Sequence, residues 1–555
     1  MHDLIKYFDI AFDAPDGIKK LREIILSLAM QGKLVPQNPS EGTASDLLKE
    51  IEKEKKKLIK EGKIKPPKPL PPIKPEEIPH EIPDTWQWVR LGEVGVYNYG
   101  STVCPENILP DSWVLDLEDI EKDTSKIVNR FKYRERMSKS NKNSFYKGDL
   151  LYGKLRPYLN KVIVADDDGY CTTEIVSIFL FSNISRFFFL NCFKAAYFKL
   201  YIDNKMYGVK MPRLGTDDAN LSLHPLPPLA EQHRIVKKIE SLMALCDALE
   251  ELKKSAAVKL QSSGNAAIEM LLSSGDEEDF NRNWTFIRDN FEELFSTPEN
   301  IKSLKKAILQ LAVMGKLVPQ NPSEGTASNL LKEIEKEKKK LIKEGKIKPP
   351  KPLPPIKPEQ IPHKIPNTWQ WVRLGEVASK VTDGDHKTPP RLEEGYRLLS
   401  AKNVRDGYLN FENCDLISEI YYLKSRERCL PEYGDLLIVS VGGTIGRSSL
   451  VPEDSKFALV RSVALIKPLF LNSKFLKNIM DSEILQSQIH LKKRGGAQPC
   501  LYLSEIERFY CPLPPLAEQH RIVKKIESLM TVCEALEESI QTKTKTQTTL
   551  LQCIR

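Results

Sequence analysis

The sequence PLPPLAEQHRIVKKIESLM occupies residues 225–243 and recurs, without a single change, at residues 512–530. A longer block, residues 32–94, recurs as residues 315–377 with four differences in 63 positions. Between these blocks each half holds about 130 residues that share only sparse features. Self-similarity on this scale indicates that the chain contains two copies of one arrangement. Each copy consists of a constant block, a variable segment and a second constant block.

The first constant block of each copy predicts two helices. Apolar residues recur at spacings of three and four, which places them on one helical face that needs a partner. They are Ile18, Leu21, Ile25 and Leu28 in the first copy and Ile301, Leu304, Ile308 and Leu311 in the second. Asp16 and Asn300 are the expected N-caps. A second helix is expected from Thr43 to Lys60, ended by Gly62.

Two further features lie within this second helix and directly after it. Its lysine run, residues 53–57, is either a solvated face or a loose contact with phosphates. After it, six prolines between residues 66 and 75 exclude a helix and favour an extended strut. The strut leads to Trp86 and Trp88, which we expect to anchor the core of the next domain.

The second constant block predicts a long helix in each copy. After Pro228 and Pro515, apolar residues step by four and three, which is the spacing of a coiled-coil seam. The seam residues are Ile235, Ile239, Leu242, Cys246 and Leu249 in the first copy and Ile522, Ile526, Leu529, Cys533, Leu536 and Ile540 in the second. We expect the two seams to pack on each other as an antiparallel coiled-coil pair. About 28 helical residues would span about 42 Å, near one turn of B-DNA at ~34 Å, as a ruler would require. The alternative is an ordinary two-helix hairpin inside a globular core.

The variable segments alternate short apolar runs with Gly, Pro, Asn and Asp, which is typical of strands and loops. The predicted strand regions are residues 148–164, 175–180, 435–441 and 457–466. The expected fold class is therefore mixed α/β, with two strand-rich domains separated by long helices and a pseudo-two-fold internal repeat.

Basic, polar and aromatic side chains gather at the predicted turns of these domains. Arg, Asn and Gln suit base edges, whereas Lys suits phosphates, so the clusters are candidate contacts with nucleic acid. The alternative for each residue is an ordinary surface side chain. The candidates are Lys154, Arg156, Tyr158, Asn160 and Arg213 in the first domain, and Asp385, His386, Lys387, Thr388, Arg391, Arg494 and Gln498 in the second.

Two motifs that flank the domains are similar to the signature of specificity subunits of type I restriction-modification enzymes. They are WQWVRLGEV, at residues 86–94 and 369–377, and PPLAEQHRIV, at residues 227–236 and 514–523. Inside the domains, GKLRPYLNK (153–161) and TDGDHKTP (382–389) resemble recurrent motifs of target-recognition domains. The resemblance covers nearly the whole chain, and the long proline-rich first region is similar to one branch of the family.

The resemblance implies a non-catalytic subunit that binds a bipartite, asymmetric site on double-stranded DNA through two target-recognition domains. It further implies a complex with two adenine methyltransferase subunits and, for cleavage, two ATP-driven translocating nuclease subunits. S-adenosylmethionine, ATP and Mg²⁺ would then belong to those partners. Two copies of one partner need two copies of one surface, so we expect the methyltransferases to dock on the repeated helices. The expected positions are Glu231, Arg234 and Lys238, together with Glu518, Arg521 and Lys525.

These observations give an expected domain organisation along the chain. A first constant helical region with its strut occupies residues 1–85, and the first target-recognition domain residues 86–225. A central helical spacer (226–275) and an acidic linker (276–300) follow. The repeated helical region (301–368), the second target-recognition domain (369–512) and a C-terminal helical spacer (513–555) complete the chain.

No catalytic or metal-binding motif is evident in the sequence. VGGTIGRS, at residues 441–448, resembles a phosphate loop but has three residues between its glycines and Arg in place of Lys, so we interpret it as a strand turn. Neither a tetrad for a flipped adenine nor a glycine-rich fingerprint after a strand is found, so methylation must come from another subunit. Ten cysteines without a CxxC pair, and no leader or membrane span, predict a cytoplasmic protein.

Two other classes of function remain at this point. A stand-alone DNA-binding regulator would bind its site tightly without partners, and a nucleic-acid enzyme of unrecognised type would need chemistry that the motifs do not provide. The net charge of +8 is mild for 555 residues, so any nucleic-acid surface must be local.

Overall fold

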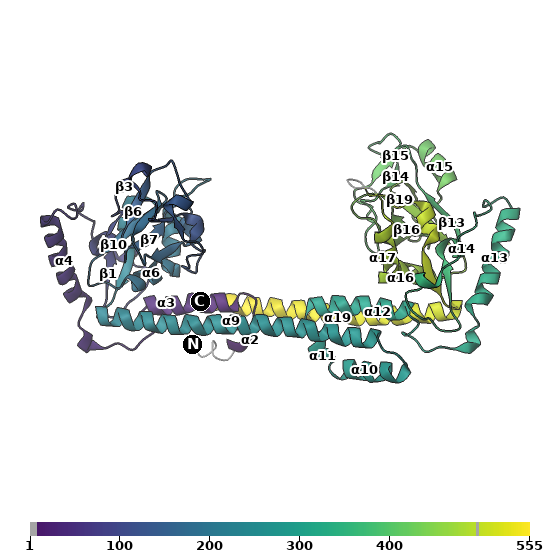
Figure 1. The fold of residues 1–555 in the computed structure, drawn as a ribbon, viewed down its shortest axis with the longest axis horizontal. Helices are drawn as coiled ribbons and strands as arrows, with labels where there is room; N and C mark the ends of the chain where they lie inside the picture. The colour runs from purple at the N-terminus through teal and green to yellow at the C-terminus, as the bar shows by residue number, and fades with distance from the viewer. Residues whose placement is uncertain (1–7, 495–498, 555) are drawn as a thin grey trace. The chain divides into compact units, whose positions relative to one another are not determined.

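The computed structural model describes residues 8–494 and 499–554. It confirms the predicted class, a mixed α/β fold with two strand-rich domains, long helices and an internal repeat (Figure 1). The chain divides into two compact units, Met1–Ser255 with Thr544–Arg555, and Ala256–Lys543. Both boundaries fall inside the longest helices, α9 (Leu229–Leu272) and α19 (Leu516–Cys553). Each of these helices therefore contributes residues to both units.

The domain of the first unit is built on a four-stranded antiparallel sheet in the order β2-β10-β7-β8. Its strands are β2 (Gly95–Tyr97), β7 (Leu150–Gly153), β8 (Val162–Val164) and β10 (Ile175–Leu180). Helices α6 (Arg186–Lys194) and α7 (Ala196–Lys205) supply four phenylalanines of its core. A second sheet has the order β3-β6-β9-β4-β5, from β3 (Thr102–Val103), β4 (Trp113–Leu115), β5 (Phe131–Lys132), β6 (Lys142–Phe145) and β9 (Gly169–Thr172).

The domain of the second unit repeats this topology with the order β13-β19-β16-β17. Its strands are β13 (Ala378–Asp383), β16 (Leu436–Val439), β17 (Ser448–Leu450) and β19 (Val463–Pro468), and its core helices are α16 (Ser473–Asp481) and α17 (Glu483–Lys492). The additional sheet is smaller, with the order β15-β14-β18, from β14 (Tyr396–Leu399), β15 (Asp415–Ile417) and β18 (Phe457–Leu459), next to α15 (Glu419–Arg428). The two domains thus share one central sheet and differ in what surrounds it.

Each domain is closed by a two-stranded antiparallel pair at its base. In the first unit β1 (Gln87–Arg90) pairs with β11 (Leu223–Leu226), and the short helices α5 (Leu91–Val94) and α8 (Thr216–Leu221) follow β1 and precede β11. In the second, β12 (Gln370–Arg373) pairs with β20 (Tyr510–Leu513), with α14 (Leu374–Val377) and α18 (Leu503–Arg508). The pair brings the end of the strut next to the start of the long helix, so the two constant blocks of each half meet here.

The helices of the first constant blocks are α3 (Gly17–Met30) and α4 (Ala44–Lys60), repeated as α12 (Pro298–Val313) and α13 (Ala327–Lys343). The expected second helix is confirmed, with Thr43 as its N-cap and Gly62 in the left-handed region just after it. Asn300 is not an N-cap, because α12 begins at Pro298 and is capped by the Thr297 side chain. The strut is extended apart from one short 3₁₀ turn at Pro75–Glu77.

The coiled-coil seams are buried inside their own units. Ile235, Ile239 and Cys246 share a core with Ile18 and Ile25 of α3, and α3 runs antiparallel to α9 (Figure 1). Arg22 bonds Asp247 and Glu250, whereas Gln37 bonds Glu231. Ile522, Ile526 and Cys533 share the other core with Ile301 and Ile308 of α12. The core of each seam is therefore supplied by a helix of its own half, which corrects the expected pairing of seam with seam.

Burial decreases along the first seam. Leu242 is partly buried against this core, but Leu249 is 38% exposed. In the second unit Leu529 and Leu536 are partly buried against their core. The long helices also exceed the expected 28 residues, with 44 in α9 and 38 in α19.

The expected acidic linker is a folded part of the second unit. It forms α10 (Glu277–Asp289) and α11 (Phe291–Leu294), and Ile287, Leu294 and Phe295 lie in the core. For α11, the reason is that the repeat extends further upstream than the long blocks show. Residues 8–21 (FDIAFDAPDGIKKL) correspond to residues 291–304 (FEELFSTPENIKSL), including α2 (Phe8–Phe12).

The tails of the long helices pack on these upstream segments. Leu551 of α19 lies with Ala11 and Phe12, just as Ala267 and Leu271 of α9 lie with Leu294 and Phe295. The repeat therefore includes the tail of each long helix. Among the described residues, none of the helices combines the length and the apolar character needed to span a membrane.

One close approach allows the α9 tail to pack in this way. At Gly264, a Cβ atom would lie 2.6 Å from the Leu294 carbonyl oxygen and 2.7 Å from the Asn300 amide nitrogen. That amide is buried and donates to the carbonyl oxygens of Leu260, at 3.0 Å, and Leu294, at 2.6 Å.

We therefore expect Gly264→Ala to destabilise the second unit by about 1–3 kcal/mol, because the methyl group would overpack this contact. In an exposed helix the same change stabilises by about 1 kcal/mol, so the sign of the effect is informative. Urea unfolding measures it, with Ser263→Ala, at an exposed position of the same helix, as the control. A gain in stability for Gly264→Ala would contradict the packing described.

Candidate nucleic-acid interface

A buried carboxylate joins the two constant blocks at the base of each domain. Glu231 is 1% exposed and accepts hydrogen bonds from the Trp86 indole nitrogen at 2.9 Å and from the Gln37 amide at 2.6 Å. Burial raises the pKa of Glu231, and the two donors oppose that shift. Glu518 makes the same bonds with Trp369 and Gln320, at 2.9 and 2.6 Å. We call this arrangement the joint.

The residues next to this carboxylate extend the joint. Gln232 accepts from the Ser185 backbone at 2.8 Å and donates to the Pro227 carbonyl oxygen at 2.9 Å, which ties α6 of the domain to α9. Arg234 bonds Glu41 through two nitrogens, at 3.0 and 2.8 Å, and holds the pKa of that carboxyl below its usual range. The PPLAEQHR motif therefore makes its main contacts within its own unit, where it connects the long helix to the strut and the domain.

This finding corrects the expected docking positions. Glu231, Arg234 and their copies Glu518 and Arg521 are engaged within their own units, Arg521 with Glu324. Only the lysines of the expected sets, Lys238 and Lys525, are exposed.

In the first domain, four segments lie side by side at one end of the central sheet. Residues 99–101 follow β2, and the Tyr99 backbone donates to the Ser177 carbonyl oxygen at 3.0 Å. The Lys154 backbone donates to the Glu174 carbonyl oxygen at 2.9 Å, and the Arg156 backbone to that of Pro212 at 2.7 Å. The loop at 154–161 is thus flanked by the turn at 172–175 and by the hairpin at 207–213. We call these segments the loop row.

The second domain has the same row in the same order. The Arg461 backbone donates to the Asp385 carbonyl oxygen at 3.0 Å, and the Ser440 backbone to that of Ser462 at 2.9 Å. The Gly442 backbone in turn donates to the Pro499 carbonyl oxygen at 3.0 Å. The loop after β16 therefore corresponds to the loop after β7, so residues 441–447 are the structural counterpart of residues 154–161.

The predicted residues of the first domain occupy this row, but they do not all face solvent. Arg156 and Tyr158 are exposed and Lys154 is half-buried. Asn160 takes φ +51° at the end of a 3₁₀ turn and is only 3% exposed, so it does not reach outward. Arg213 bonds both oxygens of Glu174, at 2.7 and 3.0 Å, and lowers the pKa of that carboxyl. Arg213 therefore fixes the hairpin.

The predicted residues of the second domain come from two other segments of the row. Asp385 accepts from Ser425 of α15, and His386 lies 3.1 Å from Asp383, which also pairs with Arg428. Arg391 pairs with Asp415 at 3.1 Å but stays 65% exposed.

The remaining predicted residues of that domain differ in their exposure. Lys387 and Thr388 are exposed, and their side chains have no partner in the described part of the chain. Arg494 is 68% exposed and lies 3.3 Å from Glu505. Gln498 lies outside the described residues.

Three residues of the second row were not selected from the sequence. Arg461 is exposed, and its side chain has no ion pair within the described ranges. It was not selected because it lies on the turn between β18 and β19, in a segment that the alternation assigned to strand. Thr444 and Arg447 line a hollow of about 420 Å³ with Asp406 and Gln486. The matching GDLL sequences at residues 148–151 and 434–437 provided the signal, because the loops that come directly after these two strands must correspond to each other.

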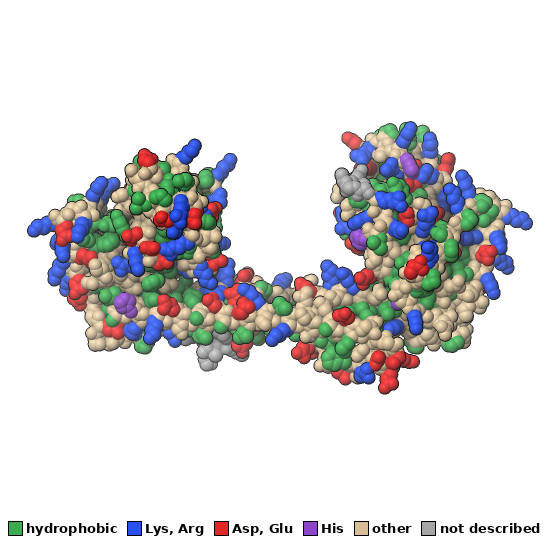
Figure 2. Space-filling model, viewed as in Figure 1, with side chains coloured by type: hydrophobic (Ala, Val, Ile, Leu, Met, Phe, Trp, Pro, Cys, Tyr) green, Lys and Arg blue, Asp and Glu red, His purple; other side chains and the backbone are tan. Residues whose placement is uncertain are grey.

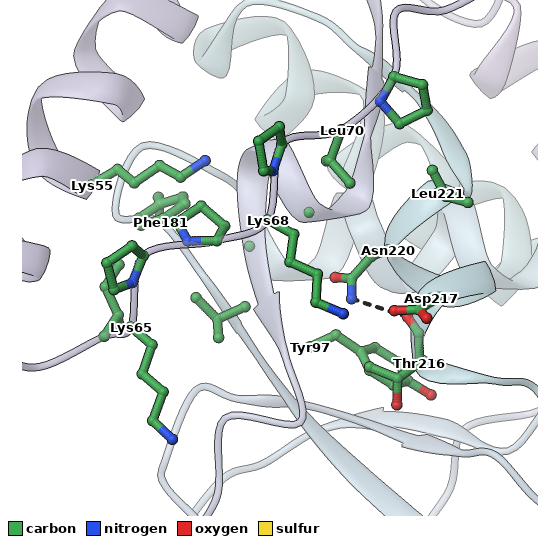
Figure 3. Close-up of a pocket in the computed structure, with 18 residues that line it drawn as sticks. Lys55, Lys65, Lys68, Leu70, Tyr97, Phe181, Thr216, Asp217, Asn220 and Leu221 are labelled. Carbon is green, nitrogen blue, oxygen red and sulfur yellow. Dashed lines mark hydrogen bonds between the residues drawn. The ribbon is translucent and has the colours of Figure 1, made fainter.

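A cavity between the strut and the first domain shows how one constant block accommodates two domains. It measures about 490 Å³, and Figure 3 shows Lys68 extending into it, with Lys55 and Lys65 nearby. In the second unit Lys338, the copy of Lys55, donates to the Gly375 carbonyl oxygen at 2.7 Å. Burial lowers the pKa of Lys338 to about 8.

The two domains differ at one residue on this side of the domain. Asn220 lines the cavity of the first unit, whereas Glu507 occupies the corresponding position in the second and interacts electrostatically with Lys338. The domain residue at this position therefore differs between the units, whereas the lysine of the constant block is the same.

Lysines also cover the outer helices. Figure 2 shows Lys and Arg side chains along α4 and along α13. Glu50 and Glu54 of α4 face the domain and bond Asn183 and Ser182. Lys53, Lys56 and Lys57 are left exposed. The positions agree with a solvated face, and the alternative of a phosphate contact stays a prediction.

The sequence matches the family model described as the type I restriction modification DNA specificity domain, over residues 83–260 and again over residues 366–545. It is 34% identical over 549 residues to the type I restriction enzyme EcoAI specificity subunit of Escherichia coli, covering 96% of this chain and 92% of that protein. The EcoEI specificity subunit of Escherichia coli is 32% identical over 559 residues, with the same coverage of 96% and 92%. Among solved structures, the HsdS subunit from Thermoanaerobacter tengcongensis aligns with a TM-score of 0.45 at 20% identity, covering 86% of this chain and 98% of that one.

Proposed function

Because the chain belongs to the family of type I restriction-modification DNA specificity subunits, we propose that it reads a bipartite, asymmetric DNA site for a complex that it scaffolds. One observation carries this proposal. The same loop row stands on two different domains, and the supports below the domains are nearly identical. Different reading surfaces on equal supports suit two different half-sites around an unread spacer.

The proposed partners are two adenine methyltransferase subunits and two nuclease subunits that translocate DNA with ATP. S-adenosylmethionine, ATP and Mg²⁺ serve those subunits, and this chain contributes no catalytic residue. Its work is to hold two reading surfaces on one frame and to present the partners to the DNA. The compartment that fits this work is the cytoplasm, where the DNA is.

The proposed reading residues are polar and basic side chains of the loop rows that reach the surface. In the first domain they are Arg156 and Tyr158, with Lys154 beside them. In the second they are the exposed Arg461 and Lys387. The half-buried Thr444 and Arg447 lie on the same row, and Arg447 pairs with Asp406 at 3.6 Å. An arginine without an internal carboxylate partner is available for bidentate contact with guanine, whereas a lysine serves phosphates.

The first prediction concerns the site itself. Methylome sequencing of cells that express this chain with its methyltransferase should show two short, different half-sites separated by a spacer of fixed length. The reason is that the two loop rows differ in sequence while their supports do not. Vector-only cells are the control, and one continuous motif or a palindrome would refute the bipartite reading.

The second prediction separates the two rows. Arg156→Ala should relax one half-site only and Arg461→Ala the other only, each by about 1–3 kcal/mol for a lost base contact. Binding of the assembled methyltransferase to site variants measures the effect across a salt series. Arg134→Ala, at an exposed position of the first domain outside the row, is the control. If either variant weakened binding to all sequences equally and reduced the salt slope, that arginine would be a phosphate contact.

The third prediction concerns docking of the methyltransferases. We propose that they bind the exposed faces of α9 and α19, where Lys237 and Lys238 are repeated as Lys524 and Lys525. Charge reversal of these four lysines should weaken co-sedimentation with the methyltransferase and leave the methylated motif unchanged.

The control uses the other repeated surface. Lys53→Glu with Lys336→Glu, at exposed positions of α4 and α13, should leave assembly intact. Loss of assembly in this pair, without loss in the four-lysine variant, would move the docking surface to the outer helices.

A further inference from the structure

The hairpin at residues 207–213 in the first loop row ends in exposed apolar side chains. Tyr207 is 59% exposed, Met211 is 49% exposed, and Val209 at the tip is 101% exposed. Lys205 and Lys210 are exposed around them. Apolar side chains that gather in water on one projecting turn mark a contact surface rather than a core. The flanking lysines indicate that the contacted surface is acidic.

The hairpin is held rigid in this conformation. The Tyr207 backbone donates to the Arg213 carbonyl oxygen at 3.0 Å and accepts from the Arg213 backbone at 2.9 Å. The Arg213 guanidinium bonds both oxygens of Glu174 and also donates to the Met211 carbonyl oxygen at 3.1 Å. Gly208 takes φ +95°, where a side chain would be strained. The apolar tip is therefore fixed in an outward position before any ligand arrives.

The tip stands directly beside the proposed reading loop. The Arg156 backbone donates to the Pro212 carbonyl oxygen at 2.7 Å, and Leu155 forms a bridge with Arg213. Any DNA that Arg156 reads must therefore also meet the hairpin. The major groove offers one apolar group on its base edges, the C5 methyl of thymine.

The internal repeat favours DNA over a protein partner as the molecule that the hairpin contacts. At an offset of 287, residues 205–213 (KMYGVKMPR) correspond to residues 492–500 (KKRGGAQPC). In this sequence alignment, Val209 and Met211 thus match Gly496 and Gln498. A partner present in two copies would need the same side chains twice, and the tip does not supply them. A difference of this kind suits half-sites of different sequence.

We propose that this hairpin enters the major groove of the first half-site, that Val209 and Met211 contact thymine methyl groups there, and that Lys205 and Lys210 contact the adjacent phosphates. The inference rests on the proposed function, because it requires that the first domain reads DNA. The tip of the hairpin thereby adds a specificity for thymine to the base-edge hydrogen bonds of Arg156.

The test removes single methyl groups from the DNA. The assembled methyltransferase is bound to duplexes in which each thymine of either half-site is replaced, one at a time, by deoxyuridine, which pairs identically. The half-site of the first domain is the one that Arg156→Ala relaxes. Wild type should lose about fourfold in affinity at one or more positions of that half-site, the value of one buried methyl group. The same replacements in the second half-site give the background for methyl loss away from this hairpin.

Val209→Ala should weaken binding to the thymine duplex and reduce the difference between thymine and deoxyuridine. Val128→Ala, at a 52% exposed valine of the same domain, is the matched control and should behave as wild type. Equal binding of wild type to every thymine and deoxyuridine duplex would overturn the proposal. So would loss of the methyltransferase subunit from the Val209→Ala complex, because the tip would then be a protein contact. A wild-type complex that does not distinguish its site from scrambled DNA would instead refute the proposed function.

Discussion

A buried carboxylate that bonds a tryptophan and a glutamine is the interaction on which each half of this protein depends. Glu231 and Glu518 lie at the base of the two domains, where the strut ends and the long helix begins. Removing either donor would leave a buried acceptor short of a partner, at a cost of about 1–3 kcal/mol. Since each carboxylate lies on the first turn of α9 or α19, the same bonds fix the direction in which that helix leaves the domain.

The joint explains how two different reading surfaces stand on one type of frame. The constant blocks supply the carboxylate, the indole, the amide and most of the closing strand pair, and the variable segment contributes one loop at Ser185 or Asn472. Elsewhere the domain can vary, as the change from Asn220 in the first unit to Glu507 in the second illustrates. The loop row can therefore change without disturbing the long helices.

The sequence was sufficient for the repeat, the helices, the sheet regions and the family, because each leaves a periodic or repeated pattern. It could not assign single contacts. Arg213 and Asn160 have the residue types of base readers, but an ion pair with Glu174 and burial at φ +51° give them structural roles. Arg461 was not selected because the alternation assigned residues 457–466 to strand and did not reveal the turn after β18. The seams were paired wrongly because a periodic apolar stripe does not identify the helix that packs on it.

The central claim is that each domain is an independent reader on an equivalent joint. The most direct measurement replaces residues 95–224 by a second copy of residues 378–511, so that the segment brings its own Glu507 to meet Lys55. Methylome sequencing of cells with this chain and its methyltransferase should then show a palindrome, made of the second half-site twice in inverse orientation across a similar spacer. A methylated site that still contained the first half-site would contradict the account.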